Sequence, residues 1–418
     1  MRIGVDVGGT HTDAVIIDNQ SVIASTKVLT SANVRDGVVN ALDEVLEQSG
    51  VEHTAIEAVM IGTTQFTNAV IERRELAPTA IIRIALPSGE LVPPMIDWPD
   101  DIADALGRHT YMIHGGRTYD GFPIAPLDDE EIDAAIADIQ KKGIRLIAIS
   151  GVFSPSDPAQ EKAVGDRLKA RIPDARITLS HSIGRMGLLE RENAALLNAS
   201  LLPLADKVVD SFRNALKDRK IECPFYISQN DGTLMSAEFA AEFPALTFAS
   251  GPTNSLRGAS LLTSLDDAVV VDIGGTTSDI GVLQDGFPRQ SNIAIEVGGV
   301  RTNFRMPDIQ AIGLGGGSLV VDDGHTIGPQ SVGYRLVEDG LVFGGDTLTA
   351  TDITVASGAA DIGDASRVSG LDDAVVQAAT RKIHSIIDEG IDQMKSSRDP
   401  VPVILVGGGA VLVSQSLD

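Results

Sequence analysis

The sequence predicts an α/β protein, because apolar strands alternate with segments of helical spacing and a glycine-rich hairpin occurs twice. Residues 132–139 carry apolar side chains at helical spacing, and residues 146–150 form a short apolar strand. Such alternation is typical of βαβ units with right-handed crossovers, so we expect a mainly parallel sheet. The hairpin occurs at residues 3–17 and 268–283, where an apolar strand meets a Gly-Gly-Thr turn and a second apolar strand returns.

The two hairpins match position by position. The first contributes Asp6, Gly8, Gly9, Thr10 and Asp13, and at one constant offset the second contributes Asp272, Gly274, Gly275, Thr276 and Asp279. A Gly-Gly turn lets backbone N–H groups approach phosphate oxygens, and threonine adds a hydroxyl donor. An aspartate at the end of the first strand suits Mg²⁺, which prefers carboxylate oxygen and keeps much of its water. One copy alone fits a plain tight hairpin equally well, but two matched copies predict a nucleoside triphosphate held from two sides.

A third glycine cluster lies near the end of the sequence. Gly407, Gly408 and Gly409 follow the apolar strand at residues 401–405. A strand followed by glycines and a helix is how an α/β domain brings backbone close to a nucleotide. Further glycines occupy residue 313 and residues 315–317, beside Ser318. They are interpreted either as a segment that approaches a ligand or as a mobile connector.

Composition limits the class of protein. At 418 residues, with 43% hydrophobic and 4% aromatic residues, the chain fits an α/β enzyme of two or three lobes. A net charge of −25 opposes binding to nucleic acid or anionic membrane. The single cysteine, Cys223, excludes an intramolecular disulfide framework and a cysteine-held cluster. No signal peptide or membrane span is recognised, so a cytoplasmic location is expected.

Three further segments carry polar residues whose role the sequence leaves open. Residues 62–69 form a predicted loop and helix start that either faces an anion or amide substrate or is simply capped by threonine. Residues 84–128 are expected to form an irregular insertion or lid, and its His109 and His114 match no standard metal-ligand spacing. The helix from Leu188 mixes apolar with charged residues, which point into a cleft or, as the favoured alternative, into solvent.

These motifs resemble those of known families. The two hairpins and the V-G-G-G-A loop resemble the actin, sugar kinase and Hsp70 ATPase superfamily. More specific motifs are similar, in order and spacing over about residues 1–415, to the N-terminal (A-type, ATP-binding) subunit of the hydantoinase/oxoprolinase family. They are G-T-T-Q-F-T-N-A-V-I-E-R (62–73), E-R-E-N-A-A-L-L-N-A (190–199), Q-N-D-G-T-L (229–234), S-G-P-T-N-S (250–255) and P-D-I-Q-A-I-G-L-G-G-G-S (307–318).

The resemblance implies an architecture and an activity. It implies two RNase H-like (actin-like ATPase) lobes around a nucleotide cleft, an N-terminal lobe at residues 1–195 and a C-terminal lobe at 196–418. It implies ATP and Mg²⁺ as cofactors, and ATP-dependent opening of a cyclic amide, such as a hydantoin or 5-oxoproline, through phosphorylation of the amide oxygen. The implied partner is a second subunit or a fused domain, and a homo-oligomer is compatible with it.

The resemblance and the motifs together suggest a role for each candidate residue. We expect Asp6 and Asp272 to organise Mg²⁺, and Asp13 or Asp279 to orient the attacking group. Substrate contacts are expected from Thr63, Thr64, Asn68 and Asp308, and Gly407, Gly408 and Gly409 are expected under the adenosine. Phosphate contacts are expected from Gly8, Gly9, Thr10, Thr12, Gly274, Gly275, Thr276 and Thr277.

Departures from the family pattern leave the substrate open. Residues 83–115 lack the family's aromatic, Arg-rich segment, and S-G-P-T-N-S replaces S-G-P-A-G-G, so a substrate other than hydantoin or 5-oxoproline is expected. The sequence ends soon after the third glycine cluster, so a truncated C-terminal lobe or a piece of a fused protein is expected. Two other functions stay open. They are a small-molecule kinase, which would release a stable phosphorylated product, and a non-catalytic nucleotide-binding module.

Overall fold

The computed structural model describes residues 1–8, 11–19, 21–29, 34–291 and 294–413. Gly9 and Thr10, two of the expected phosphate contacts, lie outside these residues. The chain divides into two units: unit 1 is Met1–Gly251 with Ser291–Met306, and unit 2 is Pro252–Gln290 with Pro307–Asp418. This division does not follow the expected boundary at 195/196, which falls inside the long helix α6 (Leu188–Asp218).

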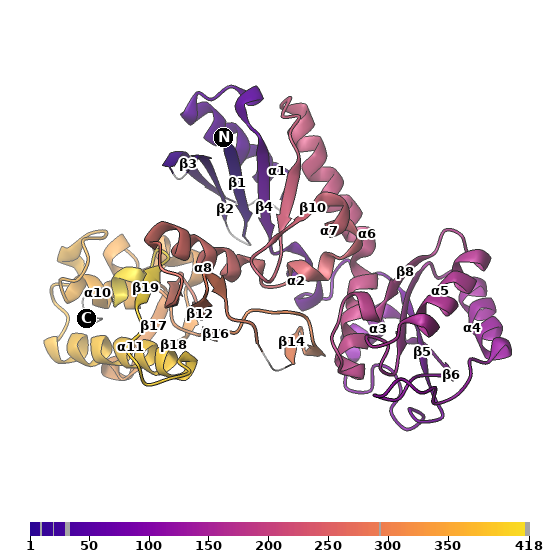
Figure 1. Ribbon diagram of the computed structural model, residues 1–418. Helices are drawn as coiled ribbons and strands as arrows, with labels where there is room; N and C mark the ends of the chain where they lie inside the picture. Colours follow the sequence, from indigo (N-terminus) through magenta and orange to yellow (C-terminus); the bar gives the residue numbers. More distant parts are fainter. Residues whose placement is uncertain (9–10, 20, 30–33, 292–293, 414–418) are drawn as a thin grey trace. The chain divides into compact units, whose positions relative to one another are not determined.

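The six-stranded sheet of unit 1 contains the first hairpin (Figure 1). Its strand order is β10-β9-β4-β1-β2-β3. β1 pairs antiparallel with β2 and parallel with β4, and β4 pairs parallel with β9. Asp6 therefore lies directly opposite Asp13, as the hairpin pattern predicts. The strands are β1 (Arg2–Val7), β2 (His11–Asp18), β3 (Ser21–Leu29), β4 (Ala58–Thr63), β9 (Phe225–Ser228) and β10 (Leu234–Ser236).

The second sheet of unit 1 is parallel throughout, which confirms the βαβ prediction. Its order is β6-β5-β7-β8, and its central strand β7 is buried at every residue. The elements are β5 (Thr79–Leu86), α3 (Asp100–Leu106), β6 (His109–His114), α4 (Asp129–Lys141), β7 (Leu146–Gly151), α5 (Ala159–Arg171) and β8 (Arg176–Leu179).

The segment 84–128 is less irregular than expected, because it contains α3 and β6. β6 is an edge strand in which only Ile113 is fully buried, so its sequence lacks a strong apolar alternation. His109 and His114 occupy the two ends of this strand, roughly 16 Å apart at strand rise, and do not form a joint metal site.

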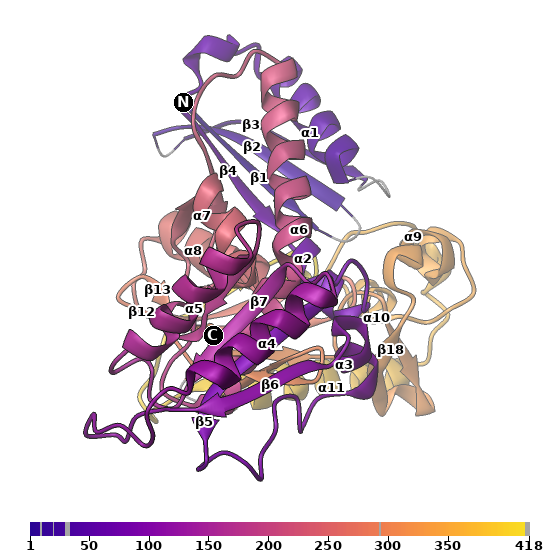
Figure 2. The ribbon, with the colours of Figure 1, turned by 90° about the vertical axis from the view of Figure 1, so that its right-hand side faces the viewer.

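Helix α6 connects the two sheets of unit 1. It packs against β5 and β7 of the parallel sheet near its start, and it also contacts α1 (Val34–Ser49), α2 (Gln65–Ile71) and α7 (Ala237–Glu242). Figures 1 and 2 show it running from the parallel sheet along the six-stranded sheet.

Arg191, Glu192, Asn193 and Asn198 of α6 are buried and only Glu190 is partly exposed, so the favoured expectation of a solvated face is wrong. The Glu192 carboxylate accepts hydrogen bonds from Arg83 Nε at 2.7 Å and from Ser150 Oγ at 2.5 Å. Arg83 and Glu192 are 1% and 0% exposed, and form an ion pair that links α6 to β5. Trp98 Nε1 donates to Asn193 Oδ1 at 2.7 Å. The ion pair and its hydrogen bonds give the buried charges of Arg83 and Glu192 polar partners, and burial without partners would lower the stability of the fold.

Unit 2 repeats the hairpin arrangement of unit 1. β11 (Ala268–Ile273) pairs antiparallel with β12 (Ser278–Gln284) and parallel with β19 (Val403–Val406), just as β1 pairs with β2 and β4. Both faces of β11 are covered: Val269, Val271 and Ile273 join one apolar core, and Ala268 and Val270 another. The first core includes helix α11 (Asp373–Met394), and the second includes α8 (Ser250–Thr263).

Smaller elements complete the chain. They are β13 (Phe287–Pro288), β14 (Ile295–Val297), β15 (Val300–Thr302), β16 (Ile309–Ile312), β17 (Ser318–Val321), β18 (Thr326–Ser331), α9 (Leu336–Asp339) and α10 (Ala350–Ala356). β14 and β15 form a hairpin of unit 1, and β17 and β18 form one of unit 2.

The buried ion pair gives the first prediction. Glu192→Leu leaves Arg83 buried without its carboxylate, so we expect the free energy of unfolding, measured by urea denaturation, to fall by about 3–5 kcal/mol. The double variant Arg83→Met with Glu192→Leu should recover most of that loss. The exposed pair of Arg108 with Asp104 is the control, and Asp104→Ala should change stability little. A double variant as unstable as the single one would contradict this account.

Candidate functional site

The second hairpin forms an exposed turn in unit 2. Asp272 on β11 lies opposite Asp279 on β12, and both side chains are partly buried. Gly274 N–H donates to Thr277 O at 2.9 Å, which closes the turn. Gly275, Thr276 and Thr277 are exposed, and a Cβ on Gly275 would meet no atom within 4 Å. The structure thus brings together all the unit 2 hairpin residues that the sequence predicts.

The third glycine segment, residues 407–409, packs directly on this turn. Gly409 N–H donates to Ile273 O at 2.8 Å. Gly407 has φ +83°, and a Cβ there would lie 2.4 Å from Ile273 O and 2.5 Å from Asp272 Oδ1. Only glycine fits such a position without displacing backbone. Gly408, by contrast, borders open space.

The glycines at 315–317 approach the turn as well. Gly316 N–H donates to Gly274 O at 3.0 Å, and Gly317 N–H donates to Gly275 O at 2.7 Å. A Cβ on Gly315 would lie 2.6 Å from Thr276 N. The alternative of a mobile connector is therefore wrong. Three glycine segments, 274–277, 315–317 and 407–409, form one cluster, which we call the glycine cluster.

Electrostatics distinguish Asp279 from the other aspartates. Burial, followed by the nearby charge of Asp272, raises the pKa of Asp279 to about 6. Desolvation and a like charge both disfavour the ionised carboxylate. A carboxyl group that titrates near neutral pH is suited to accept a proton from an attacking group.

The equivalent aspartate in unit 1 has a different environment. Asp13 Oδ1 and Oδ2 accept hydrogen bonds from Lys27 Nζ at 3.0 and 3.1 Å. This pair is substantially exposed. Gly8 is partly buried in the first hairpin, and Thr12 is fully buried. The two hairpins therefore share a backbone pattern while their aspartates differ in chemistry.

The expected substrate residues fall in two places. β1 and β4 place Val7 opposite Thr63, and Thr64 N–H and Oγ1 donate to Val7 O at 3.4 and 3.3 Å. Thr63 Oγ1 accepts from Gln65 N–H at 3.2 Å, and Asn68 Nδ2 donates to Thr64 Oγ1 at 3.4 Å. These hydroxyl groups bond within the chain, but Thr64, the N-cap residue of α2, makes no side-chain capping hydrogen bond, so the threonine-capping alternative is not confirmed.

Asp308 is not brought to the glycine cluster. It forms an ion pair with Arg289 at 2.8 Å. Asp308 directly precedes Ile309, the first residue of β16, which pairs with Gly281. The last residue of β16, Ile312, pairs with Ser278 beside the turn, so Asp308 lies at the end of the strand away from the turn. Its expected substrate contact gains no support from this position.

Two contacts of the candidate hairpins were not predicted from the sequence, one at the glycine cluster of unit 2 and one in the first hairpin of unit 1. Thr351 Oγ1 on α10 donates to Gly316 O at 2.8 Å, and Lys27 pairs with Asp13. A threonine inside a short buried helix and a lysine on an edge strand carry no distinguishing local pattern. The only available signal was the density of glycines at 313–317.

The described residues contain neither a metal-ligand group nor a helix that could span a membrane. Within residues 1–8, 11–19, 21–29, 34–291 and 294–413, no three His, Cys, Asp or Glu side chains group as metal ligands. Across the same part of the chain, every helix is too short or too polar to cross a lipid bilayer.

The raised pKa of Asp279 predicts a pH dependence of stability. Between the ordinary pKa of 3.8 and about 6, the folded chain holds a proton that the unfolded chain has released. The free energy of unfolding contributed by Asp279 is therefore highest at low pH, and it is lost as pH rises through the folded pKa. Asp279→Asn removes this loss. We expect the variant to exceed the wild type in stability at about pH 7.5 by on the order of 1–3 kcal/mol, and to match it near pH 4.

Urea denaturation over a pH series measures this difference. Asp13→Asn is the matched control, because it removes an ion pair with Lys27 and should not stabilise the chain. Equal pH dependence in wild type and Asp279→Asn would refute the assignment.

Comparisons with known proteins place the chain in a family. The model of the hydantoinase/oxoprolinase N-terminal region matches residues 2–172, and the hydantoinase/oxoprolinase model matches residues 191–396. An uncharacterized protein of Methanocaldococcus jannaschii is 28% identical over 391 residues, which cover 85% of this chain and 56% of that protein.

Two named relatives are enzyme subunits. Caprolactamase subunit alpha of Pseudomonas jessenii is 25% identical, with 85% of this chain and 54% of the subunit covered. The gamma subunit of acetophenone carboxylase of Aromatoleum aromaticum is 25% identical, with 85% and 53% covered. The chain thus spans about half the length of the curated relatives that it matches.

Solved structures support the predicted fold class. The crystal structure of ATP-dependent caprolactamase from Pseudomonas jessenii has a TM-score of 0.78 at 22% identity, covering 98% of this chain and 65% of that chain. A nucleotide-free acetone carboxylase structure has a TM-score of 0.62 at 20% identity, covering 95% and 62%. Together with the repeated hairpins, they support the prediction of an α/β protein with two RNase H-like units. The chain belongs to the hydantoinase/oxoprolinase family, as its motifs predicted.

Proposed function

We propose that this chain is the nucleotide-binding part of an ATP-dependent enzyme that opens a cyclic amide by phosphorylating the amide oxygen. The observation that carries this proposal is the glycine cluster of unit 2, where the segments 315–317 and 407–409 pack on the turn between Asp272 and Asp279. The caprolactamase relative, an ATP-dependent enzyme, supports the choice of reaction.

The glycine cluster suits the phosphate end of ATP. The turn 274–277 offers backbone and two threonine hydroxyls at an exposed position, with open space beside Gly275 and Gly408. Asp272 and Asp279 supply carboxylate oxygen of the kind Mg²⁺ prefers, so these residues fit the metal, with Asp272 as the proposed ligand. Bound Mg²⁺ would neutralise charge on the phosphates. The equivalent hairpin of unit 1 carries Asp6, Gly8 and Thr12.

A pocket next to the third glycine segment suits the adenosine end. It has a volume of about 250 Å³ and begins where Gly409 leads into the short helix η8 (Ala410–Leu412). This volume is below the roughly 300–1,000 Å³ of pockets that hold whole drug-sized ligands, and it suits a single heterocyclic base. Its lining residues are Ile353, Thr354, Ser357, Ala359, Thr380, Ile383, His384, Val411 and Leu412.

The proposed chemistry overcomes the poor electrophilicity of an amide. The amide oxygen attacks the γ-phosphorus, and ADP leaves with the electrons of the broken P–O bond. Water then adds to the activated carbon, the ring C–N bond breaks, and nitrogen takes a proton. A second water releases phosphate from the resulting acyl phosphate. Asp279, with its pKa of about 6, is the proposed acceptor for the proton of an attacking water.

A carboxylating activity is the second candidate. It is favoured by the acetophenone carboxylase gamma subunit among the relatives and by the fold shared with acetone carboxylase. In either case the proposed role of this chain is to position ATP and to stabilise the negative charge of its phosphates. Because the chain spans about half of these relatives, we propose that a second subunit, or a further part of a longer polypeptide, completes the enzyme.

Phosphate release tests the function. ATP, Mg²⁺ and a panel of lactams, hydantoins, ketones with bicarbonate, and carboxylic acids are supplied to the chain with its neighbouring gene product. We expect release of inorganic phosphate that depends on a lactam, and its loss in Asp279→Asn by at least about a hundredfold, the usual scale of acid–base catalysis. A stable phosphorylated product would select the kinase alternative. Stimulation by ketone with bicarbonate alone would select carboxylation.

Nucleotide affinity tests the glycine cluster. Gly407→Ala places a methyl group against Ile273 O and Asp272 Oδ1, so we expect calorimetry to report at least about tenfold weaker binding of MgATP. Gly408→Ala faces open space and should bind as the wild type does. Circular dichroism verifies that both variants fold. Unchanged affinity in folded Gly407→Ala would remove this cluster from the nucleotide site.

A further inference from the structure

A groove runs along the open side of β8, an edge strand of the parallel sheet in unit 1. In the described part of the chain, β8 pairs with β7 alone. The groove has a volume of about 430 Å³, and all four residues of β8 line it. Lys169 of α5, Leu202 of α6 and Phe243 after α7 line it as well. The edge of the sheet is therefore recessed between helices but is not covered by them.

Alternate residues of β8 direct their backbone groups into this groove. Arg176 N–H donates to Arg145 O, the residue before β7, at 2.7 Å. In a parallel pair, every second residue of a strand bonds to the neighbouring strand. Arg176 and Thr178 therefore bond to β7, and the N–H and C=O groups of Ile177 and Leu179 point away from it.

The chain itself occupies both ends of this outward row of backbone groups. Lys169 Nζ donates to Ala175 O at 2.7 Å, and Ser182 Oγ donates to Leu179 O at 2.6 Å. Between these ends, neither backbone group of Ile177 nor the N–H of Leu179 has a protein partner among the described residues. Unpaired N–H and C=O groups on an edge strand are a template for a further strand.

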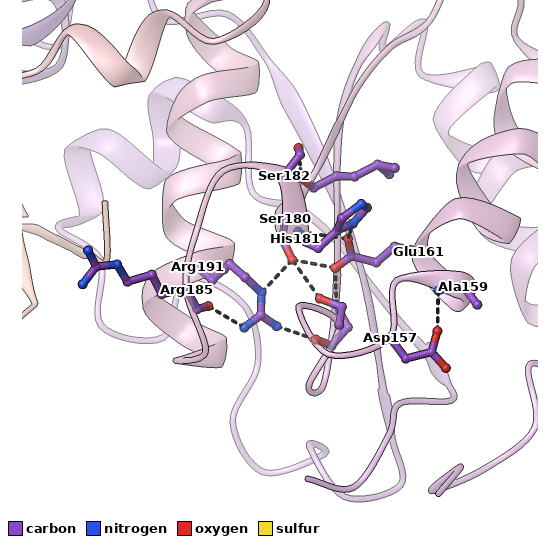
Figure 3. Close-up of polar contacts among 11 residues, drawn as sticks. Asp157, Ala159, Glu161, Ser180, His181, Ser182, Arg185 and Arg191 are labelled. Atoms are coloured by element: carbon purple, nitrogen blue, oxygen red, sulfur yellow. Dashed lines mark hydrogen bonds and ion pairs between the residues drawn. The ribbon is translucent and has the colours of Figure 1, made fainter. Parts of the chain in front are cut away.

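The end of the groove at Ser182 is anchored by buried groups. Ser182 belongs to the short helix η2 (Ser180–Ser182). Ser180 Oγ donates to the Glu161 carboxylate at 2.5 Å and accepts from Arg191 Nε at 2.9 Å. Figure 3 shows Glu161 of α5 and Arg191 of α6 reaching Ser180 from opposite sides. Both side chains are fully buried, so this end of the groove is arranged before a ligand binds.

The two walls of the groove lie on opposite faces of the sheet. Ile177 packs against the apolar core that includes α5, the helix of Lys169. Thr178 Oγ1 accepts from Asn198 of α6 at 3.2 Å, and Asn198 also donates to the carbonyl oxygen of Glu242 at 3.0 Å. A second copy of this edge carries the same helices on both faces, and they would collide with these walls. A single extended strand has no such walls and fits between them.

Each wall presents one charge that has no ionic partner among the described residues. On the α5 wall, Lys169 Nζ bonds only a carbonyl group, and the nearby Asp174 is paired with Arg145 at 2.6 Å. On the opposite wall, Glu242 lines the groove and forms no ion pair within the described part of the chain. Arg176 is already paired with an aspartate of α6 at 2.5 Å. The groove therefore suits a ligand that carries one charge of each sign.

We propose that this groove binds an extended peptide segment of a partner protein, which joins the parallel sheet as its fifth strand. The segment pairs with the free backbone groups of Ile177 and Leu179. Successive side chains of a strand point to opposite faces, so an acidic side chain that meets Lys169 and a basic one that meets Glu242 are neighbours in the segment. The groove lies wholly within unit 1 and uses no residue of the glycine cluster, so this proposal goes beyond the proposed function.

Fluorescence anisotropy with labelled, end-capped hexapeptides tests the proposal on the full chain. The probes are Thr-Val-Glu-Lys-Val-Thr and Thr-Val-Lys-Glu-Val-Thr, because the direction of the added strand decides which charge comes first. The control Thr-Glu-Val-Lys-Val-Thr has the same composition, but both of its charges point to one face. We expect one of the two probes to bind saturably and at least about threefold more tightly than the control, the scale of one exposed ion pair.

Charge reversal tests the wall residue. Lys169→Glu should weaken binding of the preferred probe about three- to tenfold, and a probe with lysine in place of its glutamate should recover the loss. Lys162→Glu changes an exposed lysine of the same helix that does not line the groove, so it should bind as the wild type does. Circular dichroism verifies that both variants fold.

Nitrogen NMR with ¹⁵N-labelled isoleucine tests the backbone contact. The Ile177 amide resonance, assigned by its absence in Ile177→Val, should shift with the preferred probe, while that of Ile82 in the buried strand β5 should not. Failure of both probes to bind, equal affinity for the control peptide, or an unshifted Ile177 amide at saturation would overturn the proposal. These wild-type comparisons decide even if Lys169→Glu does not fold. They need no nucleotide, so they are independent of the phosphate-release assay.

Discussion

The close packing of backbone on the β11–β12 turn is the constraint on which the candidate site depends. Gly407 leaves no room for a Cβ against Ile273 O and Asp272 Oδ1, and Gly315 leaves none against Thr276 N. The turn is held by main-chain hydrogen bonds to Gly316, Gly317 and Gly409. A site built from backbone in this way is arranged before any ligand arrives, which lowers the entropy cost of binding.

The same constraint appears in unit 1 with different residues. Val7 O accepts from Thr64 N–H, as Ile273 O accepts from Gly409 N–H, and Val7 and Ile273 occupy equivalent positions in the two hairpins. The 62–68 segment is thus the unit 1 counterpart of the third glycine segment. The repeat does not extend to charge. Each of these aspartates lies opposite another aspartate, but Asp13 also forms an ion pair with Lys27, whereas burial and the charge of Asp272 raise the pKa of Asp279. This difference supports placing proton transfer in unit 2.

Local patterns predicted the features that depend on local geometry. The two hairpins, the parallel sheet and the strand before Gly407 were all evident from spacing. The contact of Gly316 and Gly317 with the turn is long-range, and a glycine run has no periodicity, so the sequence left two interpretations. The polar start of α6 was misjudged because burial of Glu192 depends on Arg83, more than a hundred residues away. Edge strand β6 was missed because only Ile113 of its residues is fully buried, so its sequence shows no alternation of apolar and polar residues.

Hydrogen–deuterium exchange with and without MgATP tests the central claim most directly. The account predicts that nucleotide slows exchange together in the three segments 274–277, 315–317 and 407–409, because one ligand would close over all of them. Unchanged exchange in these segments, or protection confined to other parts of the chain at saturating nucleotide, would contradict it.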